Sequence, residues 1–213
     1  SKTESYMTEY LMVMGQLNYS IKHLRKFMKP KLKIPSLSQF PATLFVIYRP
    51  YGVVLIMSPW NYPIELTLTP LVSAIAAGNT VILKPSNYSQ SSTQVIKEIC
   101  GEAFPKGLVN IIEGGHEENQ ELLEKKFDYI FFTGNSNVGR IVMEKASKNL
   151  TPITLELGGK SPTIIESSAD LKLTAKRILF GKLLNSGQTC IAPDYLLAKE
   201  EIKNSLIGEI LSE

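Results

Sequence analysis

The chain has 213 residues, of which 44% are hydrophobic, so it can bury a substantial core as one large or two small globular domains. Its 23 basic and 20 acidic residues nearly balance, and a net charge of +3 gives no support for a nucleic-acid partner. No apolar run approaches the roughly eighteen residues that cross a bilayer, so we expect no membrane segment in this chain.

In chain order, helical spacing over residues 6–28 is followed by a Pro- and Ser-bearing connector to about Ala42 and by strand-like runs at 44–48 and 52–57. Strands and helices then alternate. We expect helices at 63–77, 89–103, 117–124 and 138–146, with strands at 80–84, 108–112, 129–133 and 152–157. Apolar strands that alternate with amphipathic helices predict an α/β fold with a Rossmann-like parallel sheet covered on both faces.

A second unit is expected to begin near Lys160, with a helix over 169–184, a strand over 195–198 and a final helix over 199–213. The sequence begins inside one helical pattern and stops inside another, so both ends look cut. Residues 22–33 carry six Lys or Arg in twelve positions, and we interpret this run as a solvated helix end whose cations suit the helix dipole.

The two cysteines, Cys100 and Cys190, are too few and too far apart for a disulfide framework or a metal site, so we expect no metal and a reducing, cytoplasmic location. Cys100 has helical spacing and is predicted to lie in the core. Cys190 lies in the polar loop NSGQTCIAP, between a helical and a strand-like run. Taken alone, Cys190 is interpreted as a small buried residue.

Polar residues gather where the predicted parallel strands end, and ligands bind at such ends. Lys84 ends TVILK, Glu156 lies near the end of PITLEL before Gly158, and Asn61 follows GVVLIM in SPWNYP. A glycine turn that could meet a pyrophosphate with backbone N–H groups follows YIFFT and comprises Gly134, Asn135, Ser136, Asn137, Val138 and Gly139. Each feature has a plainer explanation: an ordinary strand-to-helix connection for the glycine turn, and an Asx-type turn for Asn61.

Together and in this order, SPWNYP, ILKPS, FTGNSNVG, LELGGKSP and GQTCIAP resemble the aldehyde dehydrogenase superfamily over essentially the whole chain. The flanking text, HLRKFMKP and YRPYGVVLIMSPWNYP, is most similar to the class 3 branch, which includes fatty and aromatic aldehyde dehydrogenases. The resemblance implies residues 1–159 as N-terminal helix and dinucleotide-binding domain, and 160–213 as the start of a second α/β, catalytic domain. It also implies an NAD- or NADP-dependent oxidation of an aldehyde, and a homodimeric parent enzyme.

The resemblance assigns a role to three residues. It implies that Cys190 is the nucleophile, that Glu156, 34 positions earlier, is the general base, and that Asn61 helps to form the oxyanion hole. Lys84 and the glycine turn, with Gly158, would bind the cofactor. Many family members carry a glutamate three residues after the lysine that corresponds to Lys84, and this glutamate binds the adenosine ribose. Here that position is Asn87, so the sequence does not decide between NAD and NADP as the cofactor.

Two other functions remain open from the sequence. A cysteine hydrolase would need a histidine to activate the thiol, and only His23 and His116 are available, neither with sequence support as a partner. A non-catalytic dinucleotide-binding module is the third possibility, because family members are roughly twice as long as this chain.

Overall fold

The computed structural model describes all residues, 1–213, and they form two compact units, Ser1–Glu156 and Leu157–Glu213. The first unit opens with a helix that is longer than the sequence predicts. It consists of α1 (Lys2–Ser5), a π-helical turn (Tyr6–Tyr10) and α2 (Leu11–Phe27). The side chain and backbone of Ser1 exchange hydrogen bonds with Glu4 in a capping box, which starts the helix at Lys2 rather than at Tyr6.

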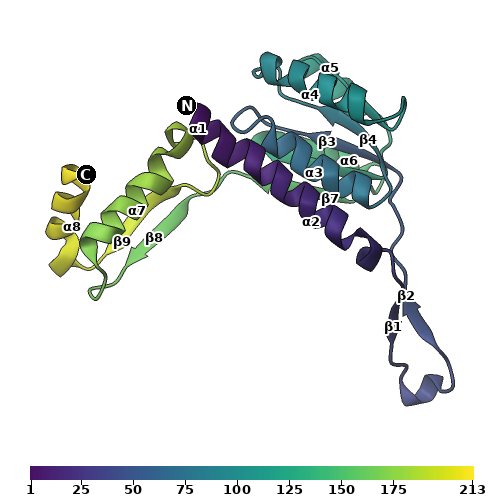
Figure 1. Cartoon of the computed structure of the whole chain (residues 1–213), viewed down its shortest axis with the longest axis horizontal. Helices are drawn as coiled ribbons and strands as arrows, with labels where there is room; N and C mark the ends of the chain where they lie inside the picture. The colour runs from purple at the N-terminus through teal and green to yellow at the C-terminus, as the bar shows by residue number, and fades with distance from the viewer. The chain divides into compact units, whose positions relative to one another are not determined.

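A five-stranded parallel sheet forms the centre of the first unit, with the strand order β5-β4-β3-β6-β7 (Figure 1). Its strands are β3 (Val53–Met57), β4 (Thr80–Lys84), β5 (Val109–Ile111), β6 (Tyr129–Gly134) and β7 (Ile153–Leu157). The connecting helices are α3 (Glu65–Ala76), α4 (Gln90–Ala103), α5 (His116–Leu123) and α6 (Ser136–Ser147). The expected Rossmann-like α/β fold is confirmed. Because strand order reverses at β3, the carboxyl ends of β3 and β6 flank the switch point where such sheets bind ligands.

The core explains why these strands are apolar along their whole length. Val54 and Ile56 of β3 pack with side chains of β4, α3 and α4 on one face of the sheet. Leu55 and Met57, which alternate with them, are also buried, so both faces of β3 are covered. Cys100 belongs to this core, as predicted, and burial raises the pKa of its thiol to about 11.

A short antiparallel hairpin precedes the sheet. It consists of β1 (Lys31–Lys33) and β2 (Leu44–Val46), joined by a loop that includes a short 3₁₀ turn (Leu37–Gln39). The sequence interpretation of this region as a Pro- and Ser-bearing connector missed β1, because three residues that alternate Lys, Leu and Lys give no apolar run. Residues 44–46 of the strand-like run at 44–48 form β2, which pairs with β1 and not with β3.

The second unit contains the parallel pair β8 (Ser161–Ile165) and β9 (Pro193–Ala198), with α7 (Leu171–Leu183) and α8 (Glu200–Ser212) packed together. Strand β8 was not predicted, because its five residues follow two glycines and include Pro162. Ile165, Ile178 and Leu206 form a small core that joins β8 to both helices. No helix in the chain combines the length and apolarity that crossing a bilayer requires.

Candidate functional site

The loop that holds Asn61 is anchored at both ends. After β3, the buried Ser58 hydroxyl lies 2.6 Å from the Thr67 hydroxyl, which itself donates to the carbonyl of Pro63 at 2.6 Å. The Glu9 carboxylate accepts hydrogen bonds from the backbone N–H groups of Ile64 (2.7 Å) and Glu65 (3.4 Å), next to the first turn of α3. These contacts fix the loop, and Asn61 is half-buried within it.

Glu9 is a residue that sequence reasoning missed, because it acts on a helix 55 positions away in sequence. Its carboxylate stands at the positive end of the α3 dipole, where a negative charge stabilises a helix. The Glu9 charge also affects the pKa of Glu65. Burial raises the pKa of Glu65, Thr69 acts in the opposite direction, and the nearby Glu9 charge raises the pKa further.

Lys84 ends β4 but does not extend into solvent. Its ammonium donates to the carbonyls of Pro85 (3.1 Å) and Gly114 (2.7 Å), and its side chain is buried. Its own carbonyl accepts from the backbone N–H of Ser58 at 3.2 Å, which links the end of β4 to the Asn61 loop. Burial lowers the pKa of Lys84, while the Glu118 carboxylate acts in the opposite direction. The lysine that sequence reasoning placed in reach of a ribose thus joins two neighbouring strand ends.

The loop after β5 is shaped around Glu118, a second residue that sequence reasoning missed. The Glu118 carboxylate accepts from the backbone N–H of Gly115 at 2.6 Å and occupies the space beside Gly114, where a Cβ would lie 2.3 Å from its carboxyl carbon. Gly114 also has φ of +126°, which other residues rarely adopt. The spacing of Glu118 three residues after Gly115, like a capping box, was the available signal.

A hollow of about 660 Å³ lies between this loop and α4. Asn87 lines it, near the backbone of Gly115, and so does the carboxylate of Glu113. Glu113 forms an ion pair with Lys97 and accepts from the Gln94 amide at 3.3 Å. The hollow therefore has a carboxylate within it even though position 87 is an asparagine.

The glycine turn after β6 leads directly into α6. The Asn135 side chain caps the helix by accepting from the backbone N–H of Val138 at 2.9 Å, and Asn137 accepts from Arg140 at 3.1 Å. A Cβ at Gly134 would lie 2.5 Å from the ring of Phe132, so any side chain at this position would require the ring to move. Ser136 is exposed at the helix start, while Val138 is half-buried and Gly139 is buried. An exposed N-terminus of a helix of this length can accept an anionic group.

Cys190 belongs to the second unit, in the loop between the end of α7 and β9, and its thiol is free and exposed. Three successive residues, Asn185, Ser186 and Gly187, have φ of 50°, 56° and 76°, which turns the chain sharply before the cysteine. The Cys190 carbonyl would be 3.0 Å from a Cβ at Gly159, so the loop lies against the GG turn that follows β7. Glu156 and Gly158 are exposed, Glu156 within β7 and Gly158 directly after it.

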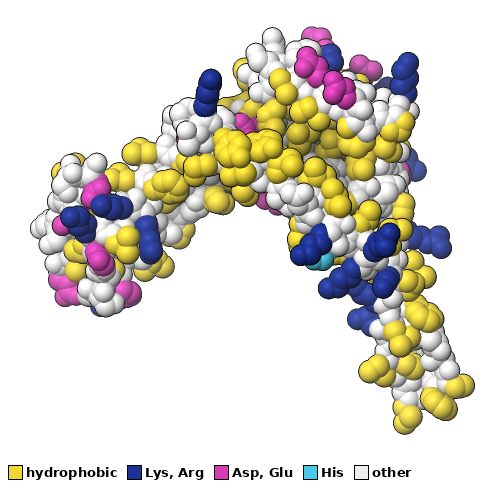
Figure 2. Space-filling model, in the orientation of Figure 1, with side chains coloured by type: hydrophobic (Ala, Val, Ile, Leu, Met, Phe, Trp, Pro, Cys, Tyr) yellow, Lys and Arg dark blue, Asp and Glu magenta, His cyan; other side chains and the backbone are white.

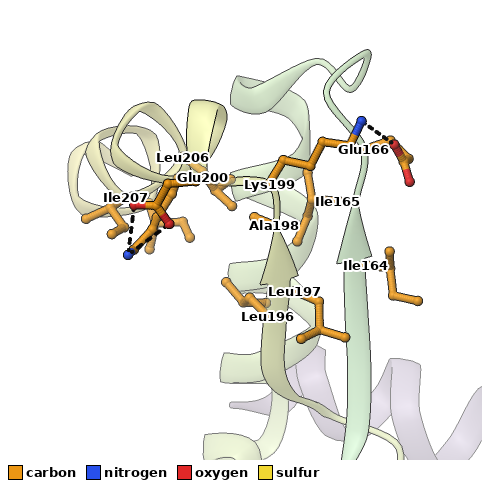
Figure 3. A pocket seen from close by; sticks show the side chains of 12 residues that line it. Ile164, Ile165, Glu166, Leu196, Leu197, Ala198, Lys199, Glu200, Leu206 and Ile207 are labelled. Atoms are coloured by element: carbon orange, nitrogen blue, oxygen red, sulfur yellow. Dashed lines mark hydrogen bonds and ion pairs between the residues drawn. The ribbon is translucent and has the colours of Figure 1, made fainter.

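The first unit thus brings Asn61, Lys84 and the glycine turn to the carboxyl ends of β3, β4 and β6, and the second brings Gly159 against Cys190. An open apolar hollow of about 640 Å³ beside β9 and α8, on the second unit, contains none of these residues (Figure 3). Ion pairs Lys199–Glu166 and Lys203–Glu200 lie at this hollow.

The aldehyde dehydrogenase family model matches residues 1–213, the entire chain. The chain belongs to the aldehyde dehydrogenase family. It is 46% identical over 207 residues to the 4,4'-diaponeurosporen-aldehyde dehydrogenase of Staphylococcus aureus, covering 97% of this chain and 45% of that protein. It is 43% identical to aldehyde dehydrogenase family 3 member B1 of Mus musculus, over 97% of this chain and 44% of the relative. The class 3 resemblance is therefore confirmed.

Solved structures of the family agree. The substrate-bound state of Staphylococcus aureus AldH has a TM-score of 0.96 and 45% identity, over 100% of this chain and 46% of that one. An aldehyde dehydrogenase of Mycobacterium tuberculosis complexed with NAD+ has a TM-score of 0.90 and 30% identity, over 99% of this chain and 43% of that one. The chain spans a little under half the length of the curated relatives it matches.

Proposed function

We propose that the protein oxidises an aldehyde to a carboxylic acid with NAD or NADP, and that Cys190 is the nucleophile. The observation that carries the proposal is the free, exposed thiol of Cys190 in a sharply turned loop against Gly159, in a chain that belongs to this family along its whole length. Cys100, the other thiol, is buried in the core of the first unit.

The chemistry follows from what these residue types can do. The Cys190 thiolate adds to the aldehyde carbon, and the resulting oxyanion is stabilised by the Asn61 amide and by the backbone N–H of Cys190. The thiohemiacetal loses hydride and becomes a thioester. Glu156 then takes a proton from water, which attacks the thioester and releases the acid and the Cys190 thiolate. A loop held at both ends suits Asn61 to this task, because a pre-positioned donor costs no reorganisation during the reaction.

The residues of the first unit fit a dinucleotide. The nicotinamide cofactor, when bound, accepts the hydride. The hollow beside Asn87 and Gly115 would hold the adenosine part, and the exposed start of α6 would hold the phosphates with backbone N–H groups. A relative from Mycobacterium tuberculosis was solved in complex with NAD+, which supports the same cofactor class here.

A cysteine hydrolase would need a histidine to activate the thiol, and the chain offers two, His23 and His116. His23 lies in α2, with its Nδ1 2.8 Å from the carbonyl of Tyr19, and His116 begins α5. The substrate-bound and NAD+-bound relatives both favour the oxidation of an aldehyde over hydrolysis.

The test is a comparison of single variants in an assay of NADH or NADPH formation with a panel of aldehydes. Cys190→Ala should abolish turnover and keep dinucleotide binding, measured by cofactor fluorescence, whereas the control Cys100→Ala should keep both. Glu156→Gln should give a burst of reduced cofactor followed by a stall, because hydride transfer needs no water and deacylation does. Turnover in Cys190→Ala comparable to wild type would refute the mechanism.

A further inference from the structure

The hollow between α4 and the loop after β5 is lined by a single charged side chain. Of the ten residues that line it, Glu113 alone carries a formal charge, and the others are proline, glycine, hydroxyl or amide residues. Asn87 is one of the amides, and its Nδ2 lies 3.5 Å from the position of a Cβ at Gly115. A ligand in the hollow therefore meets one carboxylate and no cation on the walls.

The Glu113 carboxylate is held in place from α4. The Lys97 ammonium forms an ion pair with one of its oxygens, and the Gln94 amide donates to the other at 3.3 Å. Gln94 and Lys97 are three residues apart on α4, so both side chains reach the same point. Each carboxylate oxygen can accept a second hydrogen bond. Lys97 does not line the hollow, so the negative partner of the pair is the one that a ligand meets.

The elements next to the hollow offer little positive charge to a ligand. The Lys84 ammonium donates to the carbonyls of Pro85 and Gly114, and the residue is only 3% exposed. Helix α5, which begins directly after the loop, contains three glutamates and no Lys or Arg. Figure 2 shows acidic side chains gathered over the part of the first unit that α4 and α5 form. The surroundings of the hollow thus reinforce the charge of Glu113.

We propose that Glu113 determines the cofactor specificity of the hollow, which selects the free 2′-hydroxyl of NAD over the 2′-phosphate of NADP. This selection rests on the proposed function, in which the hollow holds the adenosine part of the dinucleotide. A ribose hydroxyl can donate a hydrogen bond to a carboxylate. A phosphate monoester carries roughly −1.5 to −2 charges at pH 7, so the same carboxylate repels it. Asn87 is uncharged and does not make this distinction.

The opposite selectivity would require Lys97 to leave Glu113 and bind the 2′-phosphate. That movement would break the ion pair between the two side chains. Glu113 and the phosphate, both negative, would then compete for one ammonium in the same hollow, and like charges brought close together oppose binding. The ion pair as it stands therefore favours the cofactor without the phosphate.

The test is calorimetric titration of the purified protein with adenosine 5′-monophosphate and with adenosine 2′,5′-bisphosphate, which differ only in the 2′-phosphate. We expect wild type to bind the monophosphate more tightly. Glu113→Gln keeps a hydrogen-bond acceptor and removes the charge, so it should tighten the bisphosphate about tenfold and change the monophosphate little. Lys97→Met leaves the carboxylate without its cation and should weaken the bisphosphate by about threefold. Fluorescence titrations with NADH and NADPH should show the same two shifts.

Two further variants separate the position of the charge from charge in general. Glu98→Gln removes a carboxylate from α4 outside the hollow and should leave the ratio of the two affinities unchanged, while Glu113→Asp keeps the charge and should keep the preference.

Three results would overturn the inference: an unchanged ratio in Glu113→Gln, an equal shift in Glu98→Gln, or shifts of the same sign in Glu113→Gln and Lys97→Met. The last result would mean that the ion pair only ties α4 to the end of β5. These results are distinct from a failure of the proposed function. If wild type bound neither nucleotide and neither reduced cofactor, the proposed function would be refuted and the inference with it.

Discussion

Replacement of Gly134 by alanine tests how tightly the glycine turn is packed. Gly134 does not have a positive φ, so alanine is conformationally acceptable and the effect is one of space. The new methyl group would lie 2.5 Å, 3.1 Å and 3.3 Å from three ring atoms of Phe132, which is 5% exposed and has little room to move. Overpacking of this kind costs about 1–3 kcal/mol.

A smaller effect acts in the opposite direction. Alanine restricts the unfolded chain, which favours folding by about 0.4–1 kcal/mol. The steric cost is larger, so we expect Gly134→Ala to lower the free energy of unfolding by about 1–2 kcal/mol and the melting temperature by about 2–8 °C for a chain of this size. Displacement of the turn should also weaken dinucleotide binding at the start of α6.

The measurements are thermal unfolding followed by circular dichroism and a titration of cofactor fluorescence. Gly101→Ala is the control, since a Cβ there meets nothing within 4 Å and the residue lies inside α4. That control should stabilise the protein, because alanine suits a helix interior better than glycine does. If Gly134→Ala melts at or above the wild-type temperature, Phe132 can yield and the argument from packing is wrong.

Three further predictions concern titration and charge. At mildly alkaline pH, iodoacetamide should label Cys190 alone in the native protein and Cys100 only in urea, because burial raises the pKa of Cys100 to about 11; mass spectrometry of the adducts checks this. Glu65→Gln should raise the melting temperature at neutral pH. A carboxyl whose pKa is raised on folding binds more protons in the folded state, so its ionisation lowers the stability of the protein above that pKa. The gain in melting temperature from the variant should therefore vanish below the ordinary pKa of 4.5. Melting temperatures of both proteins measured across pH test this. Asn87→Glu should raise the NAD over NADP preference in kcat/KM about tenfold, or ~1.4 kcal/mol, since a carboxylate at that position of the hollow repels a 2′-phosphate. Steady-state kinetics with both cofactors would contradict this if the ratio stayed the same.

The strands of the large sheet could be predicted because each is a continuous apolar run buried on both faces, as Val54 to Met57 are. Strand β1 could not, because its lysines face solvent and only pairing with β2 makes it a strand. Strand β8 could not, because Pro162 is unfavourable in a strand except at an edge, which is where a two-stranded sheet places it.

The sequence indicated where the candidate site residues lie, because polar side chains follow the predicted strands. It did not indicate which groups those side chains contact. The sequence predicted that Lys84 faces a ligand. In the structure its ammonium donates to the carbonyls of Pro85 and Gly114, and the second contact depends on the fold of a loop 30 residues away. Glu9 gave no sequence signal as a partner of α3, because a contact of that separation exists only once the helix α2 has packed on α3. Tertiary contacts of this kind leave no local pattern.

The place of Lys84 limits how the loops around it can be redesigned. Its carbonyl holds the Asn61 loop through Ser58, and its ammonium holds the loop after β5 through Gly114. A graft that replaces either loop must therefore keep the backbone of one shared position. A loop taken from another protein must supply a hydrogen-bond donor for the carbonyl of residue 84 or a carbonyl for its ammonium; without these groups both loops lose their alignment together.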